Sequence, residues 1–310
     1  MPPVIYAKPY LNGQDLVTEL VGKGLRVHSV ADAEAILNRM NYYRFKAYLR
    51  PFLDVAAKRY NAPAEFNDGL QLYRFDAEFR EWIFSLIARL EVKLRSRLDQ
   101  VVTEHTGNPF WYLDNTLFSG IDHLGVQSKI DMSFQKSNYE FVLHYKANYV
   151  NNRSAAYPHL PPFWMAAELS TFGQIRILYQ SLIKSRFGTL PAPNKLDDLA
   201  NQFGARNIKV LNGWMTCLRD IRNKCAHHSR LWNTICRQPA GMNGVLAIAP
   251  THLNRIYLTL VLLQVMSKNI CLDTTIRHDL QNLLASYPLA SRFAASMGIP
   301  VGWDTDPIWA

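Results

Sequence analysis

The residues best suited to chemistry stand close together in the stretch WMTCLRDIRNKCAHHSRLWN, residues 214–233. Cutting RNA by transesterification needs a base for the ribose 2′-OH, an acid for the leaving 5′-oxygen, and positive charge on the phosphate. Histidine suits the proton transfers because its unperturbed pKa is about 6.5. Arginine suits the phosphate because its planar guanidinium stays charged and donates two hydrogen bonds at once. Arg222 and His227, with Asn223 between them, supply these groups without a metal ion.

The spacing of this pair places a condition on the structure. Residues five apart on an unbroken helix point about 140° apart, because a helix has 3.6 residues per turn. Arg222 and His227 therefore need a helix end or kink near Lys224–Ala226, or a second copy of the chain across a dimer interface. His228 also satisfies the spacing, so the choice between the two histidines stays open. Spacing alone favours a plainer alternative, a basic helix end whose histidine caps carbonyls or packs in the core.

Further cations could hold an RNA backbone. Arg219, Lys224 and Arg230 flank the pair within the same stretch. Arg95 and Arg97 lie on the most strongly periodic helical segment and could follow phosphates. A solvated charged face is the commoner explanation for that second pair.

A separate group near the N-terminus interleaves cations with aromatic rings. Arg44 and Lys46 follow Tyr42 and Tyr43, and such a combination can stack bases and hold a nucleic-acid backbone. Core packing by the two tyrosines is the favoured alternative.

The elements that must position these residues are predicted to be helices throughout, with no competing strand pattern. Apolar residues from Leu70 to about Glu104 keep spacings of three and four over about nine turns. A helix over about 205–223 leads into the histidines, and a single helix is predicted over 32–48. Other helices are expected near 16–21, 124–148, 163–185, 196–203, 253–269, 274–286 and 289–297, with a proline-marked loop at 191–193.

Two domains are predicted from this pattern. Residues 1–60 form an N-terminal helical subdomain, and residues 61–310 form a larger helical domain that begins with a linker over 60–69. One continuous domain is the alternative, because 310 residues suit either division.

Composition narrows the class of protein. Apolar residues make up 48% of the chain and aromatics 12%, which argues against disorder. No run of about 18 apolar residues occurs, so no membrane span or membrane partner is expected, and Ile256–Val265 is predicted to be a buried helix. The N-terminus lacks the features of a signal peptide, which predicts a cytoplasmic protein. A net charge of +9 favours RNA or DNA as a partner before membrane, although many cytosolic proteins are equally basic.

The cysteines do not form a recognisable metal site. Cys217, Cys225, Cys236 and Cys271 include no C-x-x-C pair. Cys225 with the neighbouring histidines lacks a fourth ligand at a known zinc spacing. We therefore expect buried or inert free thiols, no bound metal and no cofactor.

Several blocks of the sequence resemble one known family. The segment RNKCAHHSRLWN closely resembles the signature RN-x-x-AHH-x-RLWN of the AbiD/AbiF-type abortive-infection family. Matching blocks occur elsewhere in the same order, namely KPYLNGQDL, MNYYRFKAYLRPF, LYRFDAEFREWIFSLIARLEVKLRSRL and PPFWMAAELSTFGQIRILY, the last with Thr171 added between Ser170 and Phe172. The resemblance extends from about Lys8 to Asn233.

This resemblance implies a fold and an activity. The family belongs to the HEPN superfamily, whose helical domains often dimerise and place R-x(4–6)-H motifs from both copies in one metal-independent ribonuclease site. By this resemblance Arg222 and His227 are expected to be catalytic, and Asn223 to orient the backbone or the substrate. Glu168, in the W-M-x-x-E block, is expected to orient Arg222 or a histidine, or to form a structural bridge between helices.

Two functions follow from the resemblance. The first is an endoribonuclease of phage defence, with a HEPN-like core and an N-terminal helical extension, acting as a homodimer or in an RNA-associated state. The alternative is a non-catalytic protein that holds a structured noncoding RNA in a defence or toxin–antitoxin-like ribonucleoprotein. A component that only binds other defence proteins is a third, less favoured function.

Overall fold

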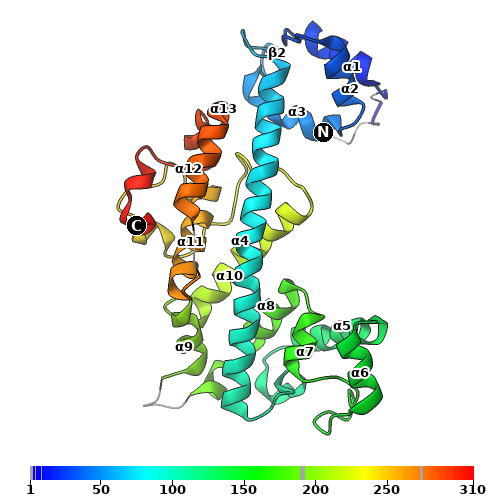
Figure 1. The fold of residues 1–310 in the computed structure, drawn as a ribbon, viewed down its shortest axis with the longest axis vertical. Helices are drawn as coiled ribbons and strands as arrows, with labels where there is room; N and C mark the ends of the chain where they lie inside the picture. The colour runs from blue at the N-terminus through cyan, green and yellow to red at the C-terminus, as the bar shows by residue number, and fades with distance from the viewer. Residues whose placement is uncertain (1–2, 4, 8, 189–192, 273–274) are drawn as a thin grey trace. The chain divides into compact units, whose positions relative to one another are not determined.

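The fold is all-α, as predicted. The computed structural model describes residues 3, 5–7, 9–188, 193–272 and 275–310. This part of the chain forms 13 α-helices and one two-stranded ribbon (Figure 1). The predictions that fall on Lys8, Pro191, Ala192 and Thr274 lie outside the described residues.

The chain divides into two compact units. The first contains residues 1–80 and 279–294, and the second contains residues 81–278 and 295–310. Helices α4 (Phe66–Thr106) and α12 (Ile276–Ser286) contribute residues to both. The division predicted from the sequence differs in that it assigns residues 61–80 and 279–294 to the larger domain.

The first unit has a small core built from short helices. Its elements besides α4 and α12 are α1 (Gly13–Gly22), α2 (Val30–Leu37), α3 (Tyr42–Leu49), η1 (Arg50–Phe52), β1 (Leu53–Asp54), β2 (Arg59–Tyr60) and α13 (Pro288–Ser291). The two strands pair antiparallel, with Leu53 opposite Tyr60. Apolar side chains from α1, α2, α3 and the start of α4 pack into one cluster, in which Leu20, Phe45 and Leu49 are fully buried.

The single helix predicted over 32–48 is wrong, because the chain breaks into α2 and α3. Asn41 begins α3, and its side-chain oxygen accepts a hydrogen bond of 3.2 Å from the backbone N–H of Arg44. Asn38 ends α2, and its side-chain oxygen accepts one of 3.0 Å from the backbone N–H of Gly13 in α1. Asparagine side chains thus satisfy backbone groups at the break, and the apolar periodicity across it does not reveal the interruption.

The second unit packs its helices around a buried one, α11 (Ile256–Asn269). Its α-helices, besides residues 81–106 of α4, are α5 (Asp122–Lys136), α6 (Glu140–Asn148), α7 (Phe163–Glu168), α8 (Phe172–Ser181), α9 (Lys195–Gln202), α10 (Ile208–Ala226) and α11. Short 3-10 helices are η2 (Trp111–Leu113), η3 (Asn115–Leu117), η4 (Lys184–Phe187), η5 (Met242–Val245), η7 (Trp303–Thr305) and η8 (Pro307–Trp309), and η6 (Ala294–Met297) spans the unit boundary. Helix α10 packs against α8, α9 and α11.

Helix α11 is the apolar segment predicted to be buried. All its residues from Ile256 to Gln264 are buried, which confirms that prediction. None of the helices in the described part of the chain is long and apolar enough to cross a membrane.

Three other predicted helices are also interrupted. The segment 124–148 divides into α5 and α6, 163–185 divides into α7 and α8, and 289–297 divides into α13 and η6. At the second break Thr171 forms a capping box with Gln174: each side chain accepts a hydrogen bond from the other's backbone N–H. The added threonine that distinguishes this block thus starts α8.

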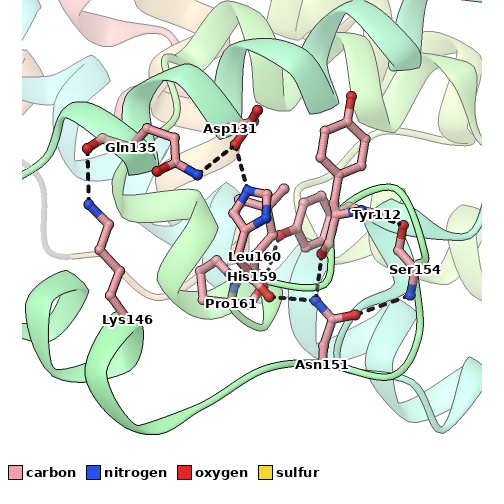
Figure 2. Close-up of polar contacts among 10 residues, drawn as sticks. Tyr112, Asp131, Gln135, Lys146, Asn151, Ser154, His159, Leu160 and Pro161 are labelled. Carbon is pink, nitrogen blue, oxygen red and sulfur yellow. Dashed lines mark hydrogen bonds and ion pairs between the residues drawn. The ribbon is translucent and has the colours of Figure 1, made fainter.

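The connection between α6 and α7 is fixed by its own polar contacts (Figure 2). The buried amide of Asn151 donates to the carbonyl oxygens of Tyr157 and Leu160, each at 2.8 Å, and its oxygen accepts from the backbone N–H of Ser154 at 3.1 Å. Figure 2 also shows His159 paired with Asp131 of α5, 2.7 Å apart. These contacts fix the proline-rich segment that precedes α7.

Candidate functional site

The candidate pair lies at the carboxyl end of α10. The helix is continuous through Ala226, and His227 is its C-cap residue with φ −89° and ψ 11°. A helix end was one of the conditions predicted near Lys224–Ala226, and the structure places it at that point.

The turn after α10 has a left-handed residue. His228 has φ +52°, a region that favours glycine or asparagine. Its backbone N–H donates to the carbonyl of Cys225 at 3.0 Å, and that of Ser229 donates to the carbonyl of Lys224 at 2.8 Å. This is the Schellman pattern of helix ends. Histidine here costs about 1 kcal/mol relative to glycine.

The chain beyond this turn is anchored in the core. Leu231 and Trp232 are fully buried, whereas His227 and His228 are exposed. Burial of these two side chains fixes the chain after the motif onto the bundle. The two imidazoles are therefore presented to solvent from a turn fixed on both sides.

Arg222 lies beside two groups on α4, and its buried Nε has no hydrogen-bond partner among the described residues. Its Nε lies 3.8 Å from Oε2 of Glu91, and its guanidinium carbon lies 5.6 Å from the centroid of the Phe84 ring. A third of the Arg222 side chain, 33%, remains exposed, whereas the Glu91 side chain is buried. Glu91 also pairs with Arg95, so one buried carboxylate is shared by two guanidinium groups.

Arg222 and the histidines do not meet within one chain. Among the described residues, no hydrogen bond or ion pair joins Arg222 to His227 or His228. The helix is regular from Arg222 to Ala226, so Arg222 and His227 point to different sides of α10, about 140° apart. The helix end alone therefore does not bring the pair together.

The carboxylate beside Arg222 is Glu91, which the sequence interpretation missed in favour of Glu168. Glu168 ends α7, is exposed, and forms no ion pair in the described part of the chain. A signal for Glu91 was present, because it follows Ile87 by four residues and precedes Leu94 by three on the buried stripe of α4. A carboxylate on such a stripe requires a cation from a packed neighbour.

Arg95 and Arg97 tie helices of the second unit together. Arg95 donates from Nη1 to the backbone carbonyl of Ala167 in α7 at 2.8 Å. Arg97 donates from Nε and Nη2 to Oε1 of Gln202 in α9, at 2.8 and 2.7 Å. Both side chains therefore make contacts within the protein, although Nε of Arg95 is buried without a hydrogen-bond partner among the described residues.

Arg219 belongs to a charged trio on the partly exposed side of α10. Its Nη2 donates to Oδ1 of Asp220 at 2.7 Å, and Nε of Arg237 donates to Oδ2 at 3.2 Å. Burial by itself raises the pKa of Asp220, but the hydrogen bonds from both arginines outweigh it and lower the pKa below its ordinary value. The trio therefore carries a net positive charge.

The other predicted residues around the motif have varied exposure. Asn223 is exposed, and Lys224 and Arg230 are half-buried. Arg44 and Lys46 are exposed on α3 in the first unit, where Nζ of Lys46 lies 5.1 Å from the centroid of the Tyr43 ring. Tyr43 is 79% exposed, so core packing does not explain this residue.

The cysteines are free, as predicted. Cys217, Cys225 and Cys236 are buried, and Cys271 is exposed. Burial raises the pKa of the Cys217 and Cys236 thiols to about 11. No group of three or more His, Cys, Asp or Glu side chains within the described ranges is placed to hold a metal ion.

These features define a helical-bundle protein with a basic, histidine-bearing motif at the exposed end of a core-packed helix. The chain belongs to the Abi-like protein family, whose sequence profile (Abi_2) matches residues 35–233. The match covers more than half of the chain, includes all of α10, and confirms the family resemblance of the blocks from MNYYRFKAYLRPF to RNKCAHHSRLWN, whereas KPYLNGQDL lies before the matched residues. Membership implies a role in abortive infection, a form of phage defence. Comparisons with curated proteins and with solved structures give no match.

Proposed function

We propose that this protein is a metal-independent endoribonuclease of phage defence, with a HEPN-like helical core. The observation that carries the proposal is the arrangement at the end of α10. His227 and His228 are exposed on a turn fixed on both sides, and Arg222 on the last turns of the same helix lies beside Glu91. These are the groups that transesterification of RNA requires.

Each residue has a defined role in this reaction. An imidazole removes the proton of the ribose 2′-OH, and a second imidazole protonates the leaving 5′-oxygen. Arg222 binds the phosphate as negative charge develops on it. Because Arg95 shares the carboxylate of Glu91, that single negative charge does not neutralise both guanidinium groups. Asn223, exposed beside Arg222, contacts the substrate.

A second copy of the chain completes the site. Arg222 and His227 diverge within one chain, and both have exposed surface. In a twofold dimer the same patch of each copy faces the other, so Arg222 of one copy can meet His227 of its partner. The active species is therefore a homodimer.

The test compares wild-type protein with Arg222→Ala and His227→Ala on mixed RNAs in EDTA. We expect wild-type protein to cleave and each variant to lose at least about 100-fold in rate, the usual contribution of a positioned acid or base. RNA binding is measured in parallel by fluorescence anisotropy. Binding without EDTA-resistant cleavage by the wild-type protein would contradict the enzyme and support the second candidate below.

The second candidate is a non-catalytic protein that holds a structured noncoding RNA. It is favoured by the lack of contact between Arg222 and the histidines in one chain, together with the net charge of +9. Arg222, Lys224 and Arg230 would then contact phosphates. Such binding weakens with salt, because each phosphate contact releases counterions.

A further inference from the structure

A positively charged pocket lies in the second unit, away from the end of α10. It has a volume of about 450 Å³ and is bordered by α8, η4 and the first half of α10. Its lining includes the cations Arg176, Lys184 and Lys209 and the polar residues Asn212 and Thr216. No carboxylate is among the described residues that line it.

Two lining residues have buried polar atoms that no protein group satisfies. Nε of Arg176 is a donor, and Oδ1 of Asn212 is an acceptor, and neither has a hydrogen-bond partner among the described residues. Buried polar atoms in folded proteins almost always have a partner, so both atoms require an explanation. Both atoms have almost no accessible surface, so the two side chains must move to reach a ligand; one that offers an anionic oxygen and a hydroxyl group then satisfies both, and a ribose phosphate has these two groups.

The charge of the pocket is only partly balanced. Nζ of Lys184 lies 2.5 Å from Oδ2 of Asp197, which also holds the start of α10. Lys209 is exposed and has no ion-pair partner within the described ranges. Burial, and then the nearby charge of Arg219, lowers the pKa of the Arg176 guanidinium. An anion bound here would relieve that repulsion.

The pocket lies on the same face of α10 as Asn223 and His227, but not as Arg222. Lys209, Gly213, Thr216, Arg219 and Asn223 follow one another at intervals of three or four residues, which places them in one row on the helix. A Cβ built at Gly213 would meet no atom within 4 Å, so the space above this glycine is open to a bound strand. From Lys209 to Asn223 the row is about 21 Å long, at 1.5 Å per residue. The next residue of the row is the C-cap His227.

We propose that this pocket binds a phosphodiester of single-stranded RNA and guides the strand along α10 to the histidines. Arg176 and Lys209 contact the phosphate, and Asn212 accepts a hydrogen bond from the ribose 2′-hydroxyl. The inference rests on the proposed function for the direction of the strand, but binding in the pocket does not depend on cleavage. A single strand fits because flexible RNA can bend from the pocket onto the helix face.

The test measures binding of a fluorescein-labelled single-stranded RNA by anisotropy at several salt concentrations in EDTA. All variants are made in the His227→Ala background, so that cleavage does not interfere. Lys209→Gln is compared with Lys93→Gln, which removes the same charge from an exposed position of α4 that does not line the pocket. We expect Lys209→Gln to weaken binding about fivefold and to reduce the slope of log Kd against log salt by about 0.7, the value for one phosphate contact on a single strand. Lys93→Gln should leave both unchanged.

Two results would overturn the pocket proposal. One is equal RNA affinity and salt slope for Lys209→Gln and Lys93→Gln. The other is weaker binding of a 5′-mononucleotide by Lys209→Gln with unchanged RNA binding, which would make the pocket a site for free nucleotides. If the Lys209→Gln effect is found but wild-type protein does not cleave RNA, the pocket stands and the ribonuclease function fails.

Discussion

At the scale of single residues, the main feature of the candidate site is a buried carboxylate that lies next to two guanidinium groups. Glu91 pairs with Arg95 on its own helix and lies 3.8 Å from Arg222 on α10. Arg95 in turn donates to the carbonyl of Ala167. A buried charge needs such partners, because its removal from water is costly. Glu91 thus lies next to both Arg222 and Arg95, the residue that joins α4 to α7.

Replacing Glu91 with glutamine tests this connection. The change leaves two guanidinium groups without their negative partner, so we expect the free energy of unfolding to fall by about 2 kcal/mol, less than for a fully buried pair. RNA cleavage should fall further than stability explains, since Arg222 loses its neighbouring negative charge. Urea denaturation measures the first effect. Glu168→Gln, an exposed carboxylate without an ion pair among the described residues, is the control and should change stability by less than about 0.5 kcal/mol. Equal stability of the two variants would contradict the structural role of Glu91.

A substitution at the left-handed residue of the turn distinguishes the roles of the two histidines. His228 has φ +52°, so His228→Gly relieves backbone strain and should stabilise the protein by about 0.5 kcal/mol after the greater freedom of glycine in the unfolded chain is subtracted. We expect the thermal midpoint to rise and cleavage to persist at a reduced rate, because water then protonates the leaving 5′-oxygen in place of the second imidazole, whereas His227→Ala should lose cleavage with little change in stability. Loss of cleavage in His228→Gly with a raised midpoint would assign the chemistry to His228 instead.

At the scale of elements, strong periodicity made some helices predictable and local capping hid others. The apolar rows of α4 and α11 continue without interruption, and both helices occur where the sequence predicts them. The breaks before Asn41 and Thr171 were missed because apolar residues keep helical spacing across them. At each of these breaks a side-chain oxygen accepts a hydrogen bond from a backbone N–H group, and this bond stabilises the start of a new helix.

The candidate site was predictable in part for the same reason. The types and order of Arg222, Asn223 and His227 are local properties of the sequence, and so is the end of α10. The partner of Arg222 is not local, because it depends on the packing of α10 against α4. The choice of Glu168 over Glu91 failed at this step.

The connection between α6 and α7 gives a prediction at this scale. Asn151→Ala removes the side-chain hydrogen bonds to Tyr157, Leu160 and Ser154. Both carbonyl groups keep a second donor, but the backbone N–H of Ser154 loses its acceptor, so we expect a loss of about 2 kcal/mol in stability. Asn148→Ala, at an exposed position on α6, is the matched control and should lose far less. Chemical denaturation compares the two variants. If Asn151→Ala is as stable as the control, the connection is held by other contacts.

At the scale of the whole molecule, the proposed site needs two copies of the chain. A mixture of Arg222→Ala and His227→Ala tests this, since neither variant cleaves alone. Random exchange makes half of the dimers mixed, and each mixed dimer has one intact site if the two residues come from different copies, so about a quarter of wild-type activity should return. Activity is followed on a labelled RNA after the variants are mixed under conditions that allow exchange. No recovery, with exchange verified by mass, would place the site within one chain.

The most direct test of the ribonuclease concerns the atom that attacks the phosphate. Wild-type protein is incubated in EDTA with an RNA oligonucleotide, and with the same sequence in which every ribose lacks its 2′-hydroxyl. We predict cleavage of the RNA, products that end in a 2′,3′-cyclic phosphate, and an intact deoxy oligonucleotide. Cleavage of both substrates, or of neither while the RNA remains bound, would contradict transesterification by the residues at the end of α10.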